Sequence, residues 1–186
     1  EYPEIQFSLK MRLGWENASE CMVLVELLNT LRLSRIALHA RTGKQQYKGH
    51  PDLEAFQGFY ELCQHPLYYN GDIESLSDIR QILTRFPLLK GVFIGRGLLS
   101  SPLLAKEFKG NETFLPEQRM SIYFAFHEEL FSAYSQVLQG ETQLLVKMKT
   151  LWEYFLPETD RKLLKRIKKS TRLQQYTESV KAIFTS

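Results

Sequence analysis

Apolar and polar residues alternate strictly near the amino-terminal end of the chain. The alternation from Phe7 to Leu13 has a period of two, which predicts a β-strand over residues 5–13. An apolar pattern with helical spacing follows over residues 17–31. The same succession of a short strand and an amphipathic helix then repeats. Further strands are predicted at residues 35–39, 66–70 and 91–94, and further helices at residues 51–64, at residues 75–86 and after Ser101-Pro102.

Four strand–helix units in succession predict parallel strands joined by right-handed crossovers, so the fold class is α/β. Both a doubly wound sheet and one half of an eight-stranded barrel fit this spacing. Strand patterns stop near residue 115, and we expect two domains, residues 1–110 and an all-α domain of residues 111–186. The helices of the second domain are predicted at residues 116–139, 141–156, 158–169 and 171–184.

The composition is that of an ordinary globular protein, with 44% hydrophobic and 24% charged residues. No apolar run approaches the roughly 18 residues that a membrane span needs, and no signal-peptide pattern is present. Cys21 and Cys63 have neither CxxC spacing nor neighbouring zinc ligands. We therefore expect reduced thiols, no metal, no membrane partner and a cytoplasmic protein.

The net charge of +3 is unevenly distributed. Residues 147–181 contain ten Lys and Arg but four Asp and Glu. A basic end of this kind favours a polyanionic partner, although solvated helix faces show the same pattern.

Polar side chains lie near the end of each predicted strand. Because the carboxyl ends of parallel strands open on one side of a sheet, we expect these groups to gather there. Glycine lets backbone N–H groups approach an anion, so the loops after the third and fourth strands are predicted to hold one phosphate between them. Two ordinary tight turns would give the same local pattern. The strand-end groups are Lys10 and Arg12, His39 and Arg41, Asn70 and Asp72, and Gly95 and Arg96.

Four segments, LKMRLGW, ALHARTGKQQYKG, YYNGDI and GVFIGRGLLSSPLL, together resemble the tRNA-dihydrouridine synthase family in order and spacing. The resemblance covers residues 5–105, and the basic helical remainder fits the family's tRNA-binding domain more loosely. It implies four βα units of a TIM barrel, the incomplete carboxyl-terminal half, followed by an all-α helical domain. Members are flavoenzymes that bind FMN and reduce the C5–C6 double bond of uridines in tRNA, with NADPH as reductant.

The resemblance also implies roles for individual residues. Lys10 matches a position at the polar edge of the isoalloxazine ring, where a positive charge stabilises the reduced flavin. His39 matches a second flavin contact. The segments around the ribityl chain and the phosphate are matched by Asn70, Gly71, Asp72, Gly95 and Arg96, and positions near the substrate uracil by Arg12 and Tyr47.

The family's catalytic cysteine, a general acid, matches neither Cys21 nor Cys63. It is expected upstream, together with the first half of the barrel, so the chain resembles a fragment of a longer protein. We expect the isolated chain to be inactive as a reductase. The open edges of half a barrel also predict self-association.

The segment RKLLKRIKKSTRLQQY places Lys and Arg densely on a predicted helix. Contacts from such side chains to phosphates give largely sequence-independent affinity. With the resemblance, tRNA binding is predicted for Arg161, Lys165, Arg166, Lys168 and Lys169.

Two alternatives remain. One is another FMN-dependent βα-barrel oxidoreductase, against which the HxRT motif, its QQYKG loop and the basic helices argue. The other is a non-catalytic RNA-binding module, which these residues do not exclude.

Overall fold

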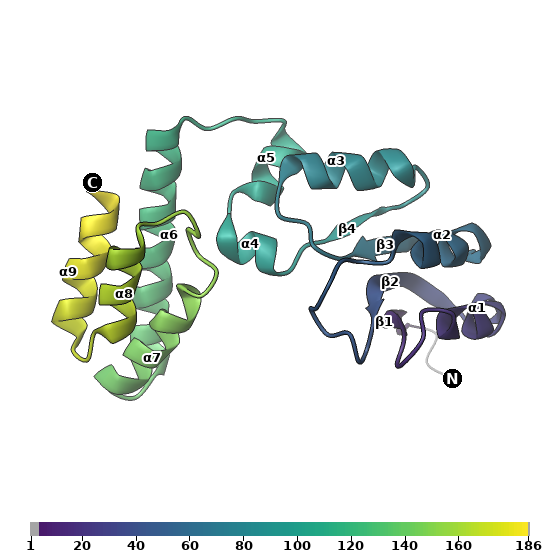
Figure 1. Ribbon diagram of the computed structural model, residues 1–186, viewed down its shortest axis with the longest axis horizontal. Coiled ribbons are helices and arrows are strands. Elements are labelled where there is room, and N and C mark those ends of the chain that lie inside the picture. Colours follow the sequence, from purple (N-terminus) through teal and green to yellow (C-terminus); the bar gives the residue numbers. More distant parts are fainter. Residues whose placement is uncertain (1–3, 186) are drawn as a thin grey trace. The chain divides into compact units, whose positions relative to one another are not determined.

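The computed structural model describes residues 4–185 (Figure 1). Contacts divide the chain after Gly95 into two compact units. The sequence places the boundary later, near residue 110, and the difference concerns two short helices, α4 (Arg96–Ser100) and α5 (Leu104–Gly110). These helices belong to the second unit by contact. The buried carboxylate of Glu107 in α5, for example, forms an ion pair with Arg119.

The first unit contains every strand and helix that the sequence predicts for it, with ends that differ by a few residues. Helix α4, directly after it in the chain, was not predicted. The elements are β1 (Phe7–Gly14), α1 (Glu20–Thr30), β2 (Leu33–Thr42), α2 (Leu53–Leu62), β3 (Leu67–Asn70), α3 (Leu76–Arg85) and β4 (Gly91–Phe93).

The four strands form one parallel sheet in the order β1-β2-β3-β4, which confirms the predicted α/β class. Right-handed crossovers between successive neighbours place α1, α2 and α3 on one face of the sheet, where Figure 1 shows them. Alternate strand residues, such as Leu38 and Tyr69, are buried beneath these helices. The ring of Tyr69 packs edge-on against Phe56 of α2, with 5.0 Å between centroids. Arg12, His39 and Asn70 lie on the opposite face.

Side-chain caps begin α2 and α3 close to the carboxyl ends of the strands. The Asp52 carboxylate accepts a hydrogen bond from the Ala55 amide at 2.9 Å. Ser75 and Asp78 form a capping box, in which each side chain accepts from the other residue's amide. These caps fix where the loops that follow β2 and β3 must end.

Among its described residues the second unit contains helices and no strand, as predicted. Besides α4 and α5 it contains α6 (Pro116–Val137), α7 (Glu141–Leu151), α8 (Arg161–Lys169) and α9 (Leu173–Phe184). Helix α7 ends earlier than predicted, because the chain turns after Leu151 and Leu156 has a φ of 48°. The core of the second unit is built mainly from residues between α6 and α9, including the fully buried Met148 and Ile167.

A buried hydrogen-bonded trio holds this core together. The Trp152 Nε1–H donates to Tyr176 Oη at 2.9 Å, and Tyr176 Oη lies 2.6 Å from His127 Nε2. Because indole is only a donor, the tyrosine proton is available for the imidazole. Burial lowers the pKa of His127, which favours the neutral ring that this arrangement needs. The trio ties α6 and the end of α7 to α9.

Candidate cofactor and RNA sites

A row of polar side chains crosses the face of the sheet that lies opposite α1 to α3. Arg12 of β1 pairs in register with His39 of β2, and His39 pairs with Asn70 of β3. Partners in neighbouring strands point to the same face and lie about 4.8 Å apart. Arg12, His39 and Asn70 therefore form a continuous row, which we call the polar row.

Lys10 lies in the adjacent row on the same face, since it is two residues before Arg12. Its partner is Ala37, and beyond this come Tyr68 and Gly91. The partner is small, and the Lys10 side chain is exposed. Lys10, Arg12 and His39 therefore lie on the same face of the sheet, which we call the functional face.

His39 is almost fully buried and surrounded by cations. Burial and the positive charges of Arg12, Lys10 and Arg41 lower its pKa to about 4, and Asp72 opposes this effect. The imidazole is therefore neutral at pH 7, so Lys and Arg side chains carry the positive charge on this face. This surplus of positive charge is suited to an anionic ligand.

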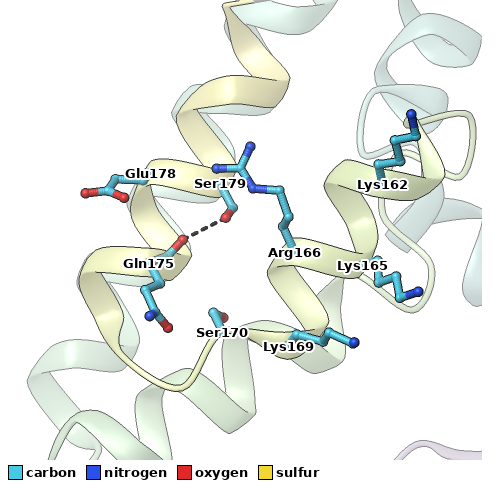
Figure 2. A pocket seen from close by; sticks show the side chains of 8 residues that line it. All are labelled: Lys162, Lys165, Arg166, Lys169, Ser170, Gln175, Glu178 and Ser179. Carbon is cyan, nitrogen blue, oxygen red and sulfur yellow. Dashed lines mark hydrogen bonds between the residues drawn. The ribbon is translucent and has the colours of Figure 1, made fainter.

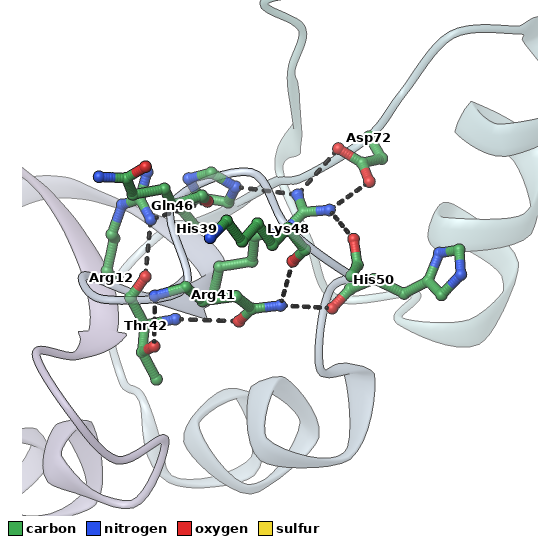
Figure 3. A network of polar contacts seen from close by, with 10 residues as sticks. Arg12, His39, Arg41, Thr42, Gln46, Lys48, His50 and Asp72 are labelled. Carbon is green, nitrogen blue, oxygen red and sulfur yellow. Dashed lines mark hydrogen bonds and ion pairs between the residues drawn. The ribbon is translucent and has the colours of Figure 1, made fainter.

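Arg12 shapes the loop of residues 43–50, which we call the Tyr47 loop (Figure 3). Its Nη1 donates to the Thr42 carbonyl at 2.7 Å and to the Gln46 carbonyl at 3.1 Å. Its guanidinium carbon lies 5.8 Å from the centre of the Tyr47 ring, in cation–π range. Tyr47 itself is 61% exposed, and its ring centroid is 6.4 Å from that of His39. The two residues predicted near a substrate base are therefore neighbours.

Arg41 continues the functional face beyond His39 and is 1% exposed. Its Nη1 donates to Asp72 Oδ1 at 2.8 Å and its Nη2 to Asp72 Oδ2 at 2.5 Å, a bidentate ion pair (Figure 3). The Nη2 also donates to the Gly49 carbonyl at 2.7 Å. The hydrogen bond to Asp72 raises the pKa of Arg41 above its ordinary value. Arg41 thereby joins the Tyr47 loop to the loop after β3.

The groups after β3 and β4 complete the predicted cofactor set. Asn70 Nδ2 donates to the Phe93 carbonyl at 2.9 Å and ties the ends of these strands together. Gly71 has a φ of +153°, and a Cβ there would lie 2.7 Å from Tyr69 Oη, so only glycine fits without strain. Gly95 borders open space. Arg96 is the first residue of α4 and belongs to the second unit.

A basic groove of about 460 Å³ lies between α8 and α9 in the second unit (Figure 2). Figure 2 shows Arg166 reaching from α8 toward α9, beside Ser179. Of the five residues predicted to bind RNA, Lys165, Arg166 and Lys169 line this groove. Arg161 does not line it, and Lys168 borders a separate hollow with Lys149. The groove-lining residues are Lys162, Lys165, Arg166, Lys169, Ser170, Gln175, Glu178 and Ser179.

Among the cations of these sites, Lys162 was not predicted, and Arg41 was predicted only as a strand-end group without a ligand role. Lys162 completes a stripe with Lys165, Arg166 and Lys169, which is the i, i+3, i+4, i+7 spacing of one helix face. Helical periodicity would have identified it. Arg41 stands two residues after His39 in a strand, so a period of two places it on the functional face. Its partners could not be read from the sequence.

Neither cysteine lies near the polar row. Cys21 is buried in α1 and bonds the Ala18 carbonyl, and Cys63 follows α2 and bonds the His65 carbonyl. Burial raises the pKa of both thiols. Among residues 4–185 no three His, Cys, Asp or Glu side chains are placed to hold a metal ion together. Within the same residues no helix is both long and apolar enough to cross a membrane.

Comparison with known proteins shows relatives of one kind. Over 100 residues the chain is 35% identical to a probable tRNA-dihydrouridine synthase of Rhizobium leguminosarum bv. phaseoli. The aligned region covers 53% of this chain and 31% of the relative. It is 36% identical over 105 residues to the probable enzyme of Aquifex aeolicus, covering 56% and 33%. It is 28% identical over 110 residues to tRNA-dihydrouridine(16) synthase of Escherichia coli K12, covering 59% and 35%.

These matches span about a third of the length of the curated relatives. The family model described as "Dihydrouridine synthase (Dus)" matches residues 2–185, which is nearly the whole chain. The chain therefore belongs to the dihydrouridine synthase family.

Proposed function

We propose that this chain supplies the flavin-contacting and tRNA-contacting portion of an FMN-dependent tRNA-dihydrouridine synthase that uses NADPH. Residues 1–110 would form the carboxyl-terminal half of a (β/α)8 barrel and residues 111–186 a helical tRNA-binding domain. The sequential strand order supports a barrel over a doubly wound sheet, in which the order reverses at a switch point. The observation that carries the proposal is the gathering of Lys10, Arg12 and His39 on one face of the sheet.

The residues present fit a flavin mononucleotide. The ligand carries a phosphate, and its reduced ring carries negative charge, whereas this face carries Lys10 and Arg12 beside a neutral His39. The open space at Gly95 leaves room for a bulky anionic group to approach the backbone. Bound flavin would supply the redox chemistry of the reaction. Lys10 would orient the ring edge and hold charge there, and Asn70, Gly71 and Asp72 would line the ribityl and phosphate side.

On the substrate side, Arg12 would hold the Tyr47 loop so that the exposed Tyr47 ring contacts the uracil. RNA bases are commonly bound by stacking on aromatic side chains once they are swung out of the folded RNA. The six cations of α8 are all exposed and have no acidic residue among them on that helix, which supports a role in phosphate binding.

We expect the isolated chain to bind without catalysing the reduction. The proton for the uracil would have to come from a cysteine on the functional face, and both cysteines are held elsewhere by carbonyl contacts. Turnover of tRNA and NADPH by this chain alone would contradict that expectation.

Self-association is the second expectation for the isolated chain. Within residues 4–185, β1 is an outer strand of the sheet and exposes Phe7 at 57%, and α1 exposes Val23 at 81%. Apolar side chains beside an unpaired strand edge favour pairing with another copy. Sedimentation at increasing concentration measures this, and a particle that stays monomeric would argue against it.

The proposal is tested by titrating FMN with the chain and following quenching of flavin fluorescence. Saturable binding is expected, and Lys10→Ala should weaken it by about tenfold, which corresponds to about 1.4 kcal/mol for one charge-assisted hydrogen bond. The loss should be larger for the reduced flavin, because its ring is negatively charged. Lys90→Ala is the matched control, since Lys90 lies just before β4, at the opposite edge of the sheet from Lys10. Absence of saturable binding, or an equal loss in both variants, would refute the flavin assignment.

A further inference from the structure

Arg41 joins two loops to which the proposed function gives different ligands. The Tyr47 loop is on the substrate side, and Asp72 is on the cofactor side. We propose that Arg41 is a positioning residue that couples these two loops. Binding of flavin beside Asp72 would then change the order of the Tyr47 loop, and binding of a base at the Tyr47 loop would affect the flavin side. This inference rests on the proposed function for the identity of the ligands, but the tie between the loops is visible without them.

The geometry makes Arg41 the connecting group. Its two terminal nitrogens bind both oxygens of Asp72, and one of them also binds the Gly49 carbonyl at 2.7 Å. The guanidinium is planar and fixed by burial, so a shift of the Asp72 carboxylate must move the donor that holds Gly49. A lysine could not replace it, because a single ammonium cannot make the parallel pair of hydrogen bonds.

Hydrogen bonds within the Tyr47 loop connect its residues, so that the loop should shift as a unit. The Gln45 side-chain amide donates to the carbonyls of Lys48 and His50, at 2.8 and 3.0 Å. At the other end Arg12 holds the Gln46 carbonyl. Because of these hydrogen bonds, a displacement of Gly49 should also displace Tyr47.

Stability alone does not explain a buried arginine at this position. Burying a guanidinium is costly, and an apolar side chain of similar volume is commonly as good or better for folding. Within the described residues Arg41 Nε is also buried without a hydrogen-bond partner, which adds to the cost. Asp72 is held in a left-handed backbone conformation, with a φ of 34°. Local features that oppose folding are most common where a chain serves a functional site.

The connection between Asp72 and the Tyr47 loop is first tested without ligand, by hydrogen–deuterium exchange. Several loop amides are hydrogen-bonded and report its order, including those of Lys44, Gln46 and Lys48. In Asp72→Asn these amides should exchange at least tenfold faster than in the wild-type chain, relative to amides of the sheet. Glu54→Gln is the control, because it breaks an ion pair to Arg85 of 2.6 Å in the same unit, on exposed side chains. Unchanged exchange of the loop in Asp72→Asn would overturn the proposal.

A second variant keeps the test decisive if Asp72→Asn folds poorly. Arg41→Met with Asp72→Asn removes both charges, and it should fold at least as well as the single variant. Its Tyr47 loop should nevertheless exchange as fast as in Asp72→Asn. A fully protected loop in this folded double variant would refute a positioning role for Arg41.

The coupling is then measured with FMN. In the wild-type chain FMN should slow exchange of the loop amides at least threefold, and in Arg41→Lys it should bind but leave them unchanged. Equal protection in both proteins would overturn the coupling. Failure of FMN to bind the wild-type chain would instead refute the flavin assignment, and the ligand-free comparison would still decide the tie between Asp72 and the loop. The two failures are therefore distinguishable.

Discussion

The basic groove gives the sharpest quantitative prediction, because α8 offers two pairs of cations that are matched in charge but differ in position. Lys165 and Arg166 line the groove, whereas Lys168 and Arg161 do not. Each pair contains one Lys and one Arg, and all four side chains are exposed on the same helix. Alanine substitution of either pair therefore removes two positive charges from the same helix, and only the location of the lost charge differs.

The magnitude follows from counterion release. Each phosphate contact contributes about 0.7 to 0.9 to the slope of log K against log salt, so the loss of two contacts should reduce the slope by about 1.5. At 0.1 M salt this corresponds to about 2 kcal/mol, or on the order of thirtyfold in affinity. The double variant of Lys168 and Arg161 should lose less than about threefold, because these side chains do not line the groove and would attract RNA only at longer range, where salt weakens the attraction.

The assay is binding of an unmodified tRNA transcript by fluorescence anisotropy, repeated from 50 to about 300 mM salt so that slopes rather than single affinities are compared. Circular dichroism of both double variants verifies that the helical unit is intact. If the two pairs lose affinity equally, α8 attracts RNA only as a diffuse basic surface. A larger loss for Lys168 and Arg161 would place the RNA on the other side of the helix and refute the groove.

Three further predictions concern the pKa and the stability of buried groups. His39 should titrate near pH 4 in NMR spectra of the ligand-free chain, and Arg12→Ala should raise this value. Because the folded pKa lies below the unfolded value of about 6.5, the stability that His39 contributes is complete above pH 6.5 and is lost as the pH falls toward 4. Gly71→Ala should destabilise the first unit by about 2 kcal/mol in urea unfolding, because its φ and the nearby Tyr69 hydroxyl both exclude a side chain. Tyr176→Phe should cost the helical unit about 2 kcal/mol, since it leaves two buried ring nitrogens without their partner, and an unchanged midpoint would show that the trio is not stabilising.

The sequence predicted the elements well because their signals are local. Strand β1 alternates, α3 has its capping box, and Pro and Gly separate the later helices. The helix at Arg96–Ser100 was missed because five residues are too few for a periodic pattern. The early end of α7 was missed for a different reason. The aromatic residues after Leu151 continue a helical pattern, but Trp152 and Phe155 pack into the core from a turn.

For the candidate site, the positions of side chains could be predicted from the sequence, whereas their contacts to backbone groups could not. Strand periodicity placed Lys10, Arg12, His39 and Asn70 near the ends of predicted strands, and the structure places them on one face of the sheet. Their ligand roles came from the family resemblance and stay predictions. The contacts of Arg12 and Arg41 to the Tyr47 loop were not found, because their acceptors include carbonyls of Thr42, Gln46 and Gly49. Every residue has such a carbonyl, so its identity in the sequence carries no signal.

Both proposed ligand sites share a feature that folding does not require. On the sheet, three cations surround a neutral His39 and lower its pKa, and the Asp72 carboxylate opposes this effect. On α8, six cations occupy nine residues without an acidic neighbour on that helix. Like charges held this closely repel one another and reduce the stability of the folded chain. A bound anion would relieve the repulsion at each site, and the two sites differ in the anion they suit. The sheet places its cations around a buried ring and is suited to one compact ligand, whereas α8 displays its cations in a solvent-exposed groove and is suited to an extended phosphate backbone.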